Sequence, residues 1–237
     1  MYQTASLKVS SKTKISEIVL NNPYLALLLE HFRIDLPCQD KTVATVCDEY
    51  NINPELFLTI TNLYNGEQQK SESQFLFNDI VTLINYLRNS HLYYADEIYP
   101  YILDIIRQMS VLSNLREMSI VEKFFNDYFT EVTEHLDYEN NIVFPYIIGL
   151  YEKTVNSKQP VVPFEYSVSE YKKRHNDIEE KLSDLKNLLI KYLPQENDQP
   201  LRRKLLLALF ELEYDLKIHS QVEDSILIPL VTRMESF

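Results

Sequence analysis

Glycine is nearly absent from this chain of 237 residues, which contains only Gly66 and Gly149. All-β folds and doubly wound α/β folds use glycine freely in turns, bulges and phosphate-binding loops. The scarcity of glycine therefore favours long helices with few tight turns. It also excludes the dinucleotide-binding fingerprint and the P-loop, both of which need closely spaced glycines.

Cysteines, basic residues and long apolar runs are also scarce. The only cysteines are Cys38 and Cys47, and no charged-then-apolar segment opens the chain, so we expect free thiols in a reducing cytoplasm. No stretch approaches the ~20 apolar residues that cross a bilayer, so no membrane is expected as a partner. The 23 Lys and Arg residues against 35 Asp and Glu give a net charge of −12, which makes nucleic acid an unfavourable partner.

The apolar residues that are present, 45% of the chain, suffice for a folded core and follow helical spacing. A polar run at residues 65–73 predicts a linker between a small helical domain (1–64) and a larger domain (74–237). In the small domain we expect four short helices, at residues 15–20, 24–32, 43–50 and 56–64, the last preceded by the helix start Asn53-Pro54. In the larger domain we expect four long helices, at about 74–109, 112–151, 164–193 and 201–234. The predicted fold class is all-α, with an up-down-up-down four-helix bundle.

Four of the five histidines fall in the predicted bundle, one on each long helix. They are His91, His135, His175 and His219, and 44 residues separate the members of the first pair and of the second pair. This repeat indicates an internal duplication. A rise of about 1.5 Å per residue takes such a segment up one helix and back down the next, which returns the second histidine to the depth of the first.

The surroundings of two histidines repeat as well. His135 and Glu139 form a His-x-x-x-Glu motif, as do His219 and Glu223, and a proline follows each glutamate six residues later. Residues four apart lie on one face of a helix, so each pair can bind one metal ion. Four imidazoles and two carboxylates are what a dinuclear site requires, with positions left for an oxo bridge or a small ligand. The absence of thiolate favours iron over structural zinc, manganese is an alternative, and ordinary buried histidines are the other interpretation.

Four further residues lie near these motifs. Glu131 and Asp215 each precede a motif histidine by four residues, which predicts either acceptors for the imidazole N–H and proton carriers, or a solvated acidic face. Tyr94 and Tyr138 each follow a ligand candidate by three residues, which predicts either a lining of the site or plain core packing.

The pattern His…His-x-x-x-Glu…His…His-x-x-x-Glu resembles that of the hemerythrin-like proteins, over residues 74 to 237. The resemblance implies a di-iron site with His91, His135, Glu139, His175, His219 and Glu223 as ligands, the two glutamates bridging.

The segments 14–23 and 30–38 are similar to the short domain that precedes the di-iron bundle in the iron-sulfur cluster repair family. That family usually carries two adjacent cysteines followed by glycines, whereas this chain reads Leu36-Pro37-Cys38-Gln39-Asp40. Cys38 alone can act as a thiol if its pKa is lowered, and a structural buried thiol is the alternative. We expect Cys47 to belong to the core and His31 to be structural.

The repair resemblance implies a cytoplasmic stress-response protein that helps restore iron-sulfur clusters damaged by nitric oxide or oxidants. Its partners would be NO, O2 or peroxide, together with proteins that carry damaged clusters. The alternatives are an O2 or NO binding or sensing protein and a di-iron enzyme that reduces NO or peroxide, so enzyme status stays open. The small domain is a candidate unit for homodimerisation or docking.

Overall fold

The described part of the computed structural model consists of helices joined by short connections. It comprises residues 8–67, 75–112, 116–156, 167, 178–194 and 197–236. Within these ranges the extended structure is limited to one isolated bridge between Lys14 and Thr42. The predicted all-α fold class is therefore confirmed. None of the helices in these ranges combines the length and apolar character needed to cross a membrane.

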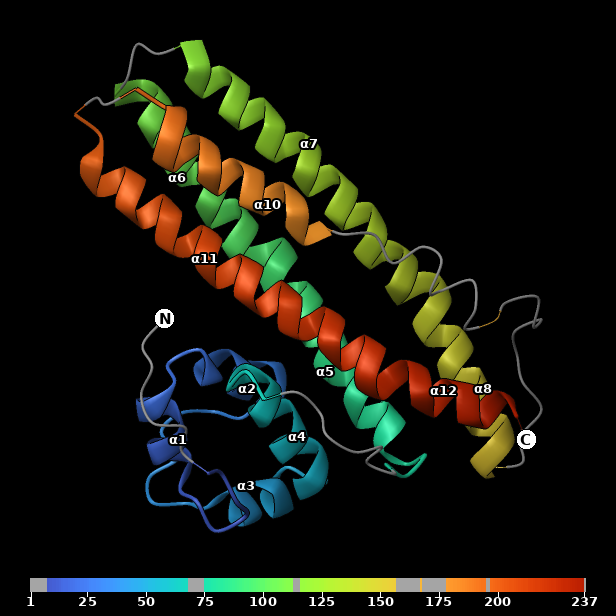
Figure 1. Cartoon of the computed structure of the whole chain (residues 1–237). Helices are drawn as coiled ribbons and strands as arrows, with labels where there is room; N and C mark the ends of the chain where they lie inside the picture. Colours follow the sequence, from blue (N-terminus) through green and yellow to red (C-terminus); the bar gives the residue numbers. More distant parts are fainter. Residues whose placement is uncertain are drawn as a thin grey trace. The chain divides into compact units, whose positions relative to one another are not determined.

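The four short helices predicted in the first part of the chain are all present (Figure 1). They are α1 (Ile15–Asn21), α2 (Leu25–His31), α3 (Val43–Glu49) and α4 (Pro54–Tyr64). The predicted start of the last helix is confirmed in detail, because the Asn53 side-chain oxygen accepts a hydrogen bond from the Glu55 N–H at 2.9 Å. Pro54 then takes the first helical position, where the lack of an N–H does no harm.

The ends of these helices show how a chain with so little glycine makes its turns. Gly66 follows α4 in the left-handed region at φ +77°, the conformation that glycine adopts without steric strain. Arg33 after α2 and Asn51 after α3 adopt the same conformation, at φ +57° and +55°. In all three places the next N–H donates to the carbonyl five residues back at 2.8 to 2.9 Å, which satisfies a carbonyl at the helix end.

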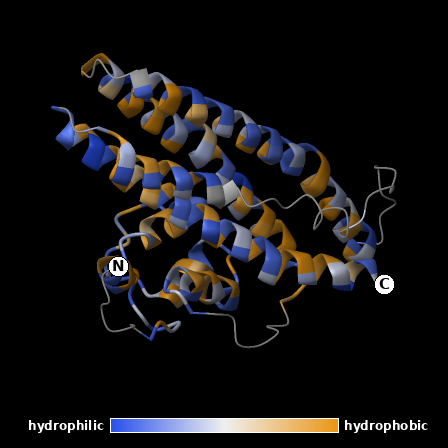
Figure 2. Cartoon of the chain, turned by 45° about the horizontal axis from the view of Figure 1, so that its top comes forward, coloured by the Kyte–Doolittle hydropathy of each residue, from blue (hydrophilic) through white to orange (hydrophobic). Residues whose placement is uncertain are grey.

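The long segments of the second part are helical, but each contains a five-residue π-helical stretch that the sequence analysis did not predict. Polar and apolar residues alternate around these helices, as expected for amphipathic elements (Figure 2). The elements are α5 (Asp79–Tyr93), η1 (Tyr94–Ile98), α6 (Tyr99–Leu112), α7 (Arg116–Tyr138), η2 (Glu139–Val143), α8 (Phe144–Asn156), α10 (Ile178–Asn187), η3 (Leu188–Tyr192), α11 (Gln199–Val222), η4 (Glu223–Leu227) and α12 (Ile228–Glu235).

Proline accounts for three of the four π stretches. Pro100, Pro145 and Pro229 each come two residues after η1, η2 and η4. A proline inside an α-helix removes one N–H and collides with the carbonyl four residues earlier. A wider turn accommodates it, because the N–H just before each proline reaches back five residues, as from Phe144 to the Glu139 carbonyl. Glu139 and Glu223, both predicted ligands, are the first residues of their π stretches.

The chain divides into two compact units. The first contains Met1–Ser90, Tyr146–Val168 and Ile218–Phe237, and the second contains His91–Pro145 and Ser169–Lys217. Helices α5, α8 and α11 each contribute residues to both units. The predicted division at 65–73 stays a prediction, and its residues 68–73 lie outside the described part of the chain.

In the first unit, α5 packs on the end of α2 through aromatic and polar contacts. Tyr86 meets Phe32 at 4.8 Å between ring centroids, and it meets the His31 ring edge-on at 5.4 Å. Asn89, one turn further along α5, donates to the His31 carbonyl at 2.8 Å and accepts from Arg33 Nε at 3.0 Å. These contacts fix the position of α5 just before Ser90.

In the second unit, α6 and α10 both contact α7 (Figure 1), and aromatic side chains pack between α6 and α7. Tyr99 stacks on Phe129 with ring centroids 4.7 Å apart. Buried Arg202 on α11 closes the connection from η3, because it donates to the carbonyls of Leu189, Leu193 and Pro194 and to the carboxylate of Asp198. The positive charge of Arg202 among these carbonyls offsets the partial negative charge at the C-terminal end of the preceding helix.

Candidate metal centre

The two His-x-x-x-Glu motifs occupy equivalent places in their helices. His135 lies in the last turn of α7 and Glu139 opens η2, while His219 lies in the last turn of α11 and Glu223 opens η4. Imidazole Nε2 lies 3.1 Å from the carboxylate Oε1 in the first motif and 3.4 Å in the second. Both glutamates are fully buried. The helical spacing therefore brings each predicted pair together.

A third imidazole reaches the first motif. His91 on α5 is buried, and its Nε2 lies 3.3 Å from Glu139 Oε2, so the two oxygens of this carboxylate face two different histidines. The other ring nitrogen, Nδ1, lies 3.2 Å from the Asn140 side-chain oxygen. Because an amide oxygen only accepts, Nδ1 carries a proton, which leaves Nε2 as the nitrogen available to a metal ion.

The same tautomer follows for His219 from a different partner. Ser90 Oγ donates its proton to the Leu87 carbonyl at 2.7 Å, so its oxygen accepts from His219 Nδ1 at 2.8 Å. The Nε2 lone pair of His219 is thereby directed toward Glu223. In metal sites, a partner on the second imidazole nitrogen orients the ligand in this way.

This arrangement fits a bound cation. In all three pairs the imidazole Nε2 and the carboxylate oxygen face one another at 3.1 to 3.4 Å, so both atoms can bind one cation. Neighbouring ligands about 2.1 Å from one ion are separated by roughly 3 Å, which matches these distances. Within the second unit, His91, His135 and Glu139 thus form one cluster of ligands drawn from two helices.

The sixth predicted ligand, His175, lies outside the described residues. His135 is the most accessible of the three described histidines beside Glu139 and Glu223, with 16% of its side chain exposed. The His219 side chain is 6% exposed.

Comparison with known proteins decides the family. The protein-family model of the hemerythrin HHE cation-binding domain matches residues 82–231, more than half of the chain. The chain belongs to this hemerythrin family. The match spans all six predicted ligands, so metal binding follows for this hemerythrin-family protein. No curated protein and no solved structure matches the chain.

The acidic residues that precede the two motif histidines have different positions. Asp215 is buried and accepts a hydrogen bond from the Tyr94 hydroxyl at 2.7 Å, so two of the predicted neighbours are joined to one another. The Glu131 side chain is 58% exposed and pairs with Lys181. An exposed side chain paired with Lys181 fits the alternative of a solvated acidic face, and a role of Glu131 at the site stays a prediction. Tyr138 is half-buried directly before η2, and its role stays a prediction.

The N-terminal thiol does not meet the condition set by the sequence analysis. Cys38 is 6% exposed, its Sγ lies 3.5 Å from the Asp35 carbonyl oxygen, and burial raises its pKa. Because the thiolate is the reactive form, this environment fits the alternative of a buried structural thiol, and the role of Cys38 stays a prediction. Cys47 belongs to the core as predicted, and burial raises its pKa to about 12. His31 is likewise buried, against Tyr86.

Sequence reasoning missed the residues that orient the imidazoles. Ser90 directly precedes one ligand and Asn140 directly follows another, yet each acts on a histidine of a different helix. Phe144, whose ring stacks on His91 at 5.5 Å, was missed as well. The one clue in the sequence was that Ser90 and Asn140 each lie next to a predicted ligand. This adjacency does not indicate which histidine each residue contacts.

Proposed function

We propose that this hemerythrin-family protein holds two iron ions and uses them in the repair of iron-sulfur clusters damaged by nitric oxide or oxidants. The observation that carries the iron site is the set of imidazole Nε2 atoms that face the buried carboxylates of Glu139 and Glu223 at 3.1 to 3.4 Å. His175 completes the proposed set of six ligands. Nitrogen and oxygen ligands without thiolate favour iron, and manganese is the metal to compare with it.

The chain's own residues supply the order of the site. Ser90 and Asn140 fix two imidazole tautomers, and Phe144 covers one face of His91. Asp215, held by Tyr94, is a buried carboxylate one helical turn before His219 and is our candidate for holding a proton near the site. When bound, an iron pair supplies a change of redox state and binding of NO, O2 or peroxide.

The repair role is supported by the similarity of residues 14–23 and 30–38 to the domain that precedes the bundle in the repair family. The environment of Cys38 limits how this role is performed. A buried thiol with a raised pKa does not suit thiol exchange, so we assign repair to the bundle.

A sensing role is the second candidate, and contacts within the first unit favour it. The end of α2 contacts α5 at Tyr86 and Asn89, and the next residue, Ser90, orients His219. A change at the metal ligands would therefore have a short route to the N-terminal helices through α5.

The experiment that separates these functions starts from metal content. The protein purified without added metal should carry two irons per chain, and its visible spectrum should change with NO under anaerobic conditions. It should then restore activity to a [4Fe–4S] enzyme inactivated by NO. His135→Ala should lose both metal and repair, whereas the control His31→Ala should keep its metal.

Each outcome has a separate meaning. Full metal loading of His135→Ala would overturn the ligand assignment. A di-iron protein that forms a stable NO adduct but restores no cluster enzyme would leave sensing as the function. Consumption of NO or peroxide over many turnovers with a chemical reductant would identify a reductase.

A further inference from the structure

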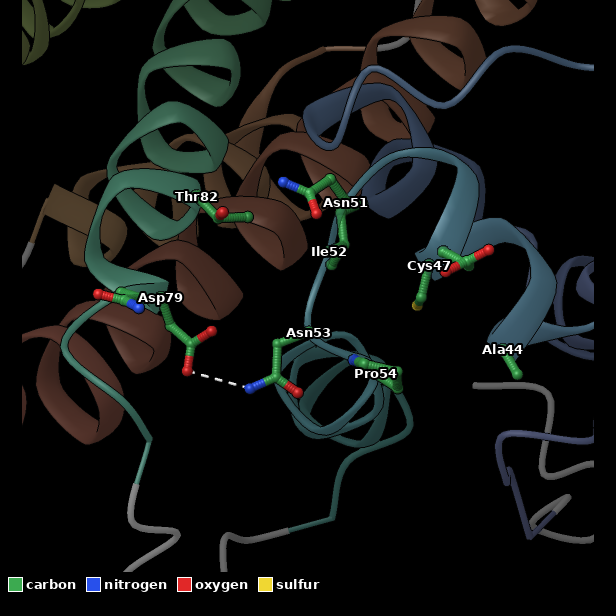
Figure 3. Close-up of a pocket in the computed structure, with 10 residues that line it drawn as sticks. Ala44, Cys47, Asn51, Ile52, Asn53, Pro54, Asp79 and Thr82 are labelled. Carbon is green, nitrogen blue, oxygen red and sulfur yellow. Dashed lines mark hydrogen bonds between the residues drawn. The ribbon is translucent and has the colours of Figure 1, made fainter.

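Three aspartates outside the predicted ligand set are buried in the described part of the chain, and two of them have a plain structural role. Asp79 accepts a hydrogen bond from Asn53 Nδ2 at 3.0 Å, which joins the start of α5 to the start of α4 (Figure 3). Asp198 forms an ion pair with the arginine that closes the connection from η3 to α11. The third is Asp215, which accepts from the Tyr94 hydroxyl at 2.7 Å. Its partner is therefore a side chain that can release both a proton and an electron.

A second pair of the same kind lies beside the first. Tyr93 directly precedes Tyr94 and donates to Glu211 Oε1 at 2.7 Å. Glu211 lies one helical turn before Asp215 on α11. The rings of the two tyrosines are 5.8 Å apart between their centroids. All four residues belong to the second unit, so two neighbouring tyrosines each have a carboxylate of their own.

Burial decreases from the first pair to the second. Tyr94 is fully buried and Asp215 is 1% exposed, whereas Tyr93 is 7% exposed and Glu211 is half-buried. Tyr94 also follows the predicted ligand His91 by three residues, which corresponds to about 4.5 Å along a helix axis. The two pairs thus lead from the neighbourhood of the metal centre toward the surface of this unit.

The contacts of the two phenol groups suit the transfer of single electrons. Loss of an electron alone would leave a positive charge on a buried phenol, which is unfavourable away from water. Each hydroxyl lies 2.7 Å from a carboxylate oxygen, which is within the range for direct proton transfer. If the proton moves to the carboxylate as the electron leaves, a neutral phenoxyl radical remains. The proton then stays within its pair, and only the electron passes between the rings.

We propose that Tyr93 and Tyr94 form an electron route between the surface of this unit and the iron pair, with Glu211 and Asp215 as proton acceptors. This electron route rests on the iron site of the proposed function and not on the repair role. Hydrogen peroxide is the oxidant, and it takes up two electrons and two protons at the metal centre to give two waters. Tyr94 replaces one of these electrons and passes its proton to Asp215.

The next step restores the buried tyrosine. Tyr93 gives one electron to the Tyr94 radical, which takes its proton back from Asp215. The proton of Tyr93 moves to Glu211 at the same time. A soluble one-electron reductant such as ascorbate then reduces the Tyr93 radical, which recovers its proton from Glu211. The sum is the transfer of one electron from the reductant to the metal centre, with no proton left on either acid.

Electron paramagnetic resonance of the iron-loaded chain, frozen soon after mixing with hydrogen peroxide, tests this route. We expect a tyrosyl radical signal that narrows when the protein carries ring-deuterated tyrosine. Tyr94→Phe should lose this signal. Asp215→Asn should lose most of it, because an amide oxygen accepts a hydrogen bond but does not take up the proton. Tyr93→Phe should keep the signal and lengthen its lifetime in ascorbate, because the supply of electrons to Tyr94 is interrupted.

Tyr99→Phe is the matched control. Tyr99 is as fully buried as Tyr94 and belongs to the same unit, but its ring stacks on Phe129. This variant should leave the radical signal unchanged. All four variants should carry as much iron as the unchanged chain, so that the signal reports on the tyrosines and not on metal loading.

The outcomes separate the electron route from the iron site. Iron-loaded protein without a tyrosyl signal, or a signal that survives in Tyr94→Phe, would overturn the electron route alone. Loss of iron from Tyr94→Phe would also overturn it, since the tyrosine would then support the site itself. An unchanged signal in Asp215→Asn would overturn the role of Asp215 as proton acceptor. A chain that binds no iron would overturn the proposed function together with the electron route.

Discussion

The two His-x-x-x-Glu motifs have the same spacing but different surroundings. In each, the histidine closes an α-helix, the glutamate opens a π stretch and a proline follows. The first motif is partly open, with the His135 side chain 16% exposed and Glu131 58% exposed. The second is enclosed, with the His219 side chain 6% exposed and Asp215 almost fully buried.

This difference shows what a duplicated motif determines and what its neighbours determine. Spacing along one helix fixes which ligands meet, because it depends only on helical geometry. The burial and hydrogen bonding of the residues around each motif depend on which neighbouring helices pack against it. Tyr94 on η1 covers Asp215, whereas Lys181 on α10 meets Glu131 at the surface.

The largest effect should come from the two glutamates. Glu139→Ala removes a carboxylate whose oxygens face two imidazoles, and Glu223→Ala removes its counterpart. If the motifs are chemically equivalent despite their surroundings, each variant should lose at least half of its bound metal by elemental analysis. Full loading of one variant and loss in the other would break the equivalence.

A smaller effect should come from the serine that serves only the second motif. Ser90→Ala removes the acceptor for His219 Nδ1, and loss of such a partner lowers metal affinity about 10- to 100-fold. Competition with a chelator measures the change. Ser236→Ala, at an exposed position near the chain's end, is the control. Equal affinities for the two variants would mean that packing alone holds the His219 tautomer.

The smallest effects should come from Asp215 and Glu131, and they test the difference in burial between the two motifs directly. Asp215→Asn weakens a buried charged hydrogen bond with Tyr94, which should lower the free energy of unfolding by about 1–3 kcal/mol. Glu131→Gln removes an exposed ion pair, which should change that free energy by less than about 0.5 kcal/mol. Urea denaturation of the two variants measures both values, and equal losses would refute the difference in burial.

Much of the fold followed from local signals. Turn residues and the Asn53-Pro54 start located the short helices to within about two residues, which is the usual uncertainty of helix ends. Four of the six ligand candidates meet as two pairs because the spacing of each pair is a property of a single helix.

The burial and the hydrogen-bond partners of the site residues depend on contacts between helices. The spacing of residues along the sequence does not predict these contacts. Glu131 and Asp215 have the same offset from their histidines, yet only one is buried. Ser90 and Asn140 act on ligands far away in the chain. The repeated glutamate-to-proline spacing was visible in the sequence, but its effect on the backbone was not anticipated, because proline inside a helix produces either a kink or a wider turn.

The π stretches also change the helical phase of the residues that follow them. Each adds a residue to one turn, which rotates everything after it by about 100° relative to an uninterrupted α-helix. The apolar stripe of α7 therefore continues on α8 with a shifted phase, and the same holds from α11 to α12. Anyone who transfers this metal centre to a designed bundle must place the heptad of each downstream segment from its proline, not from its histidine.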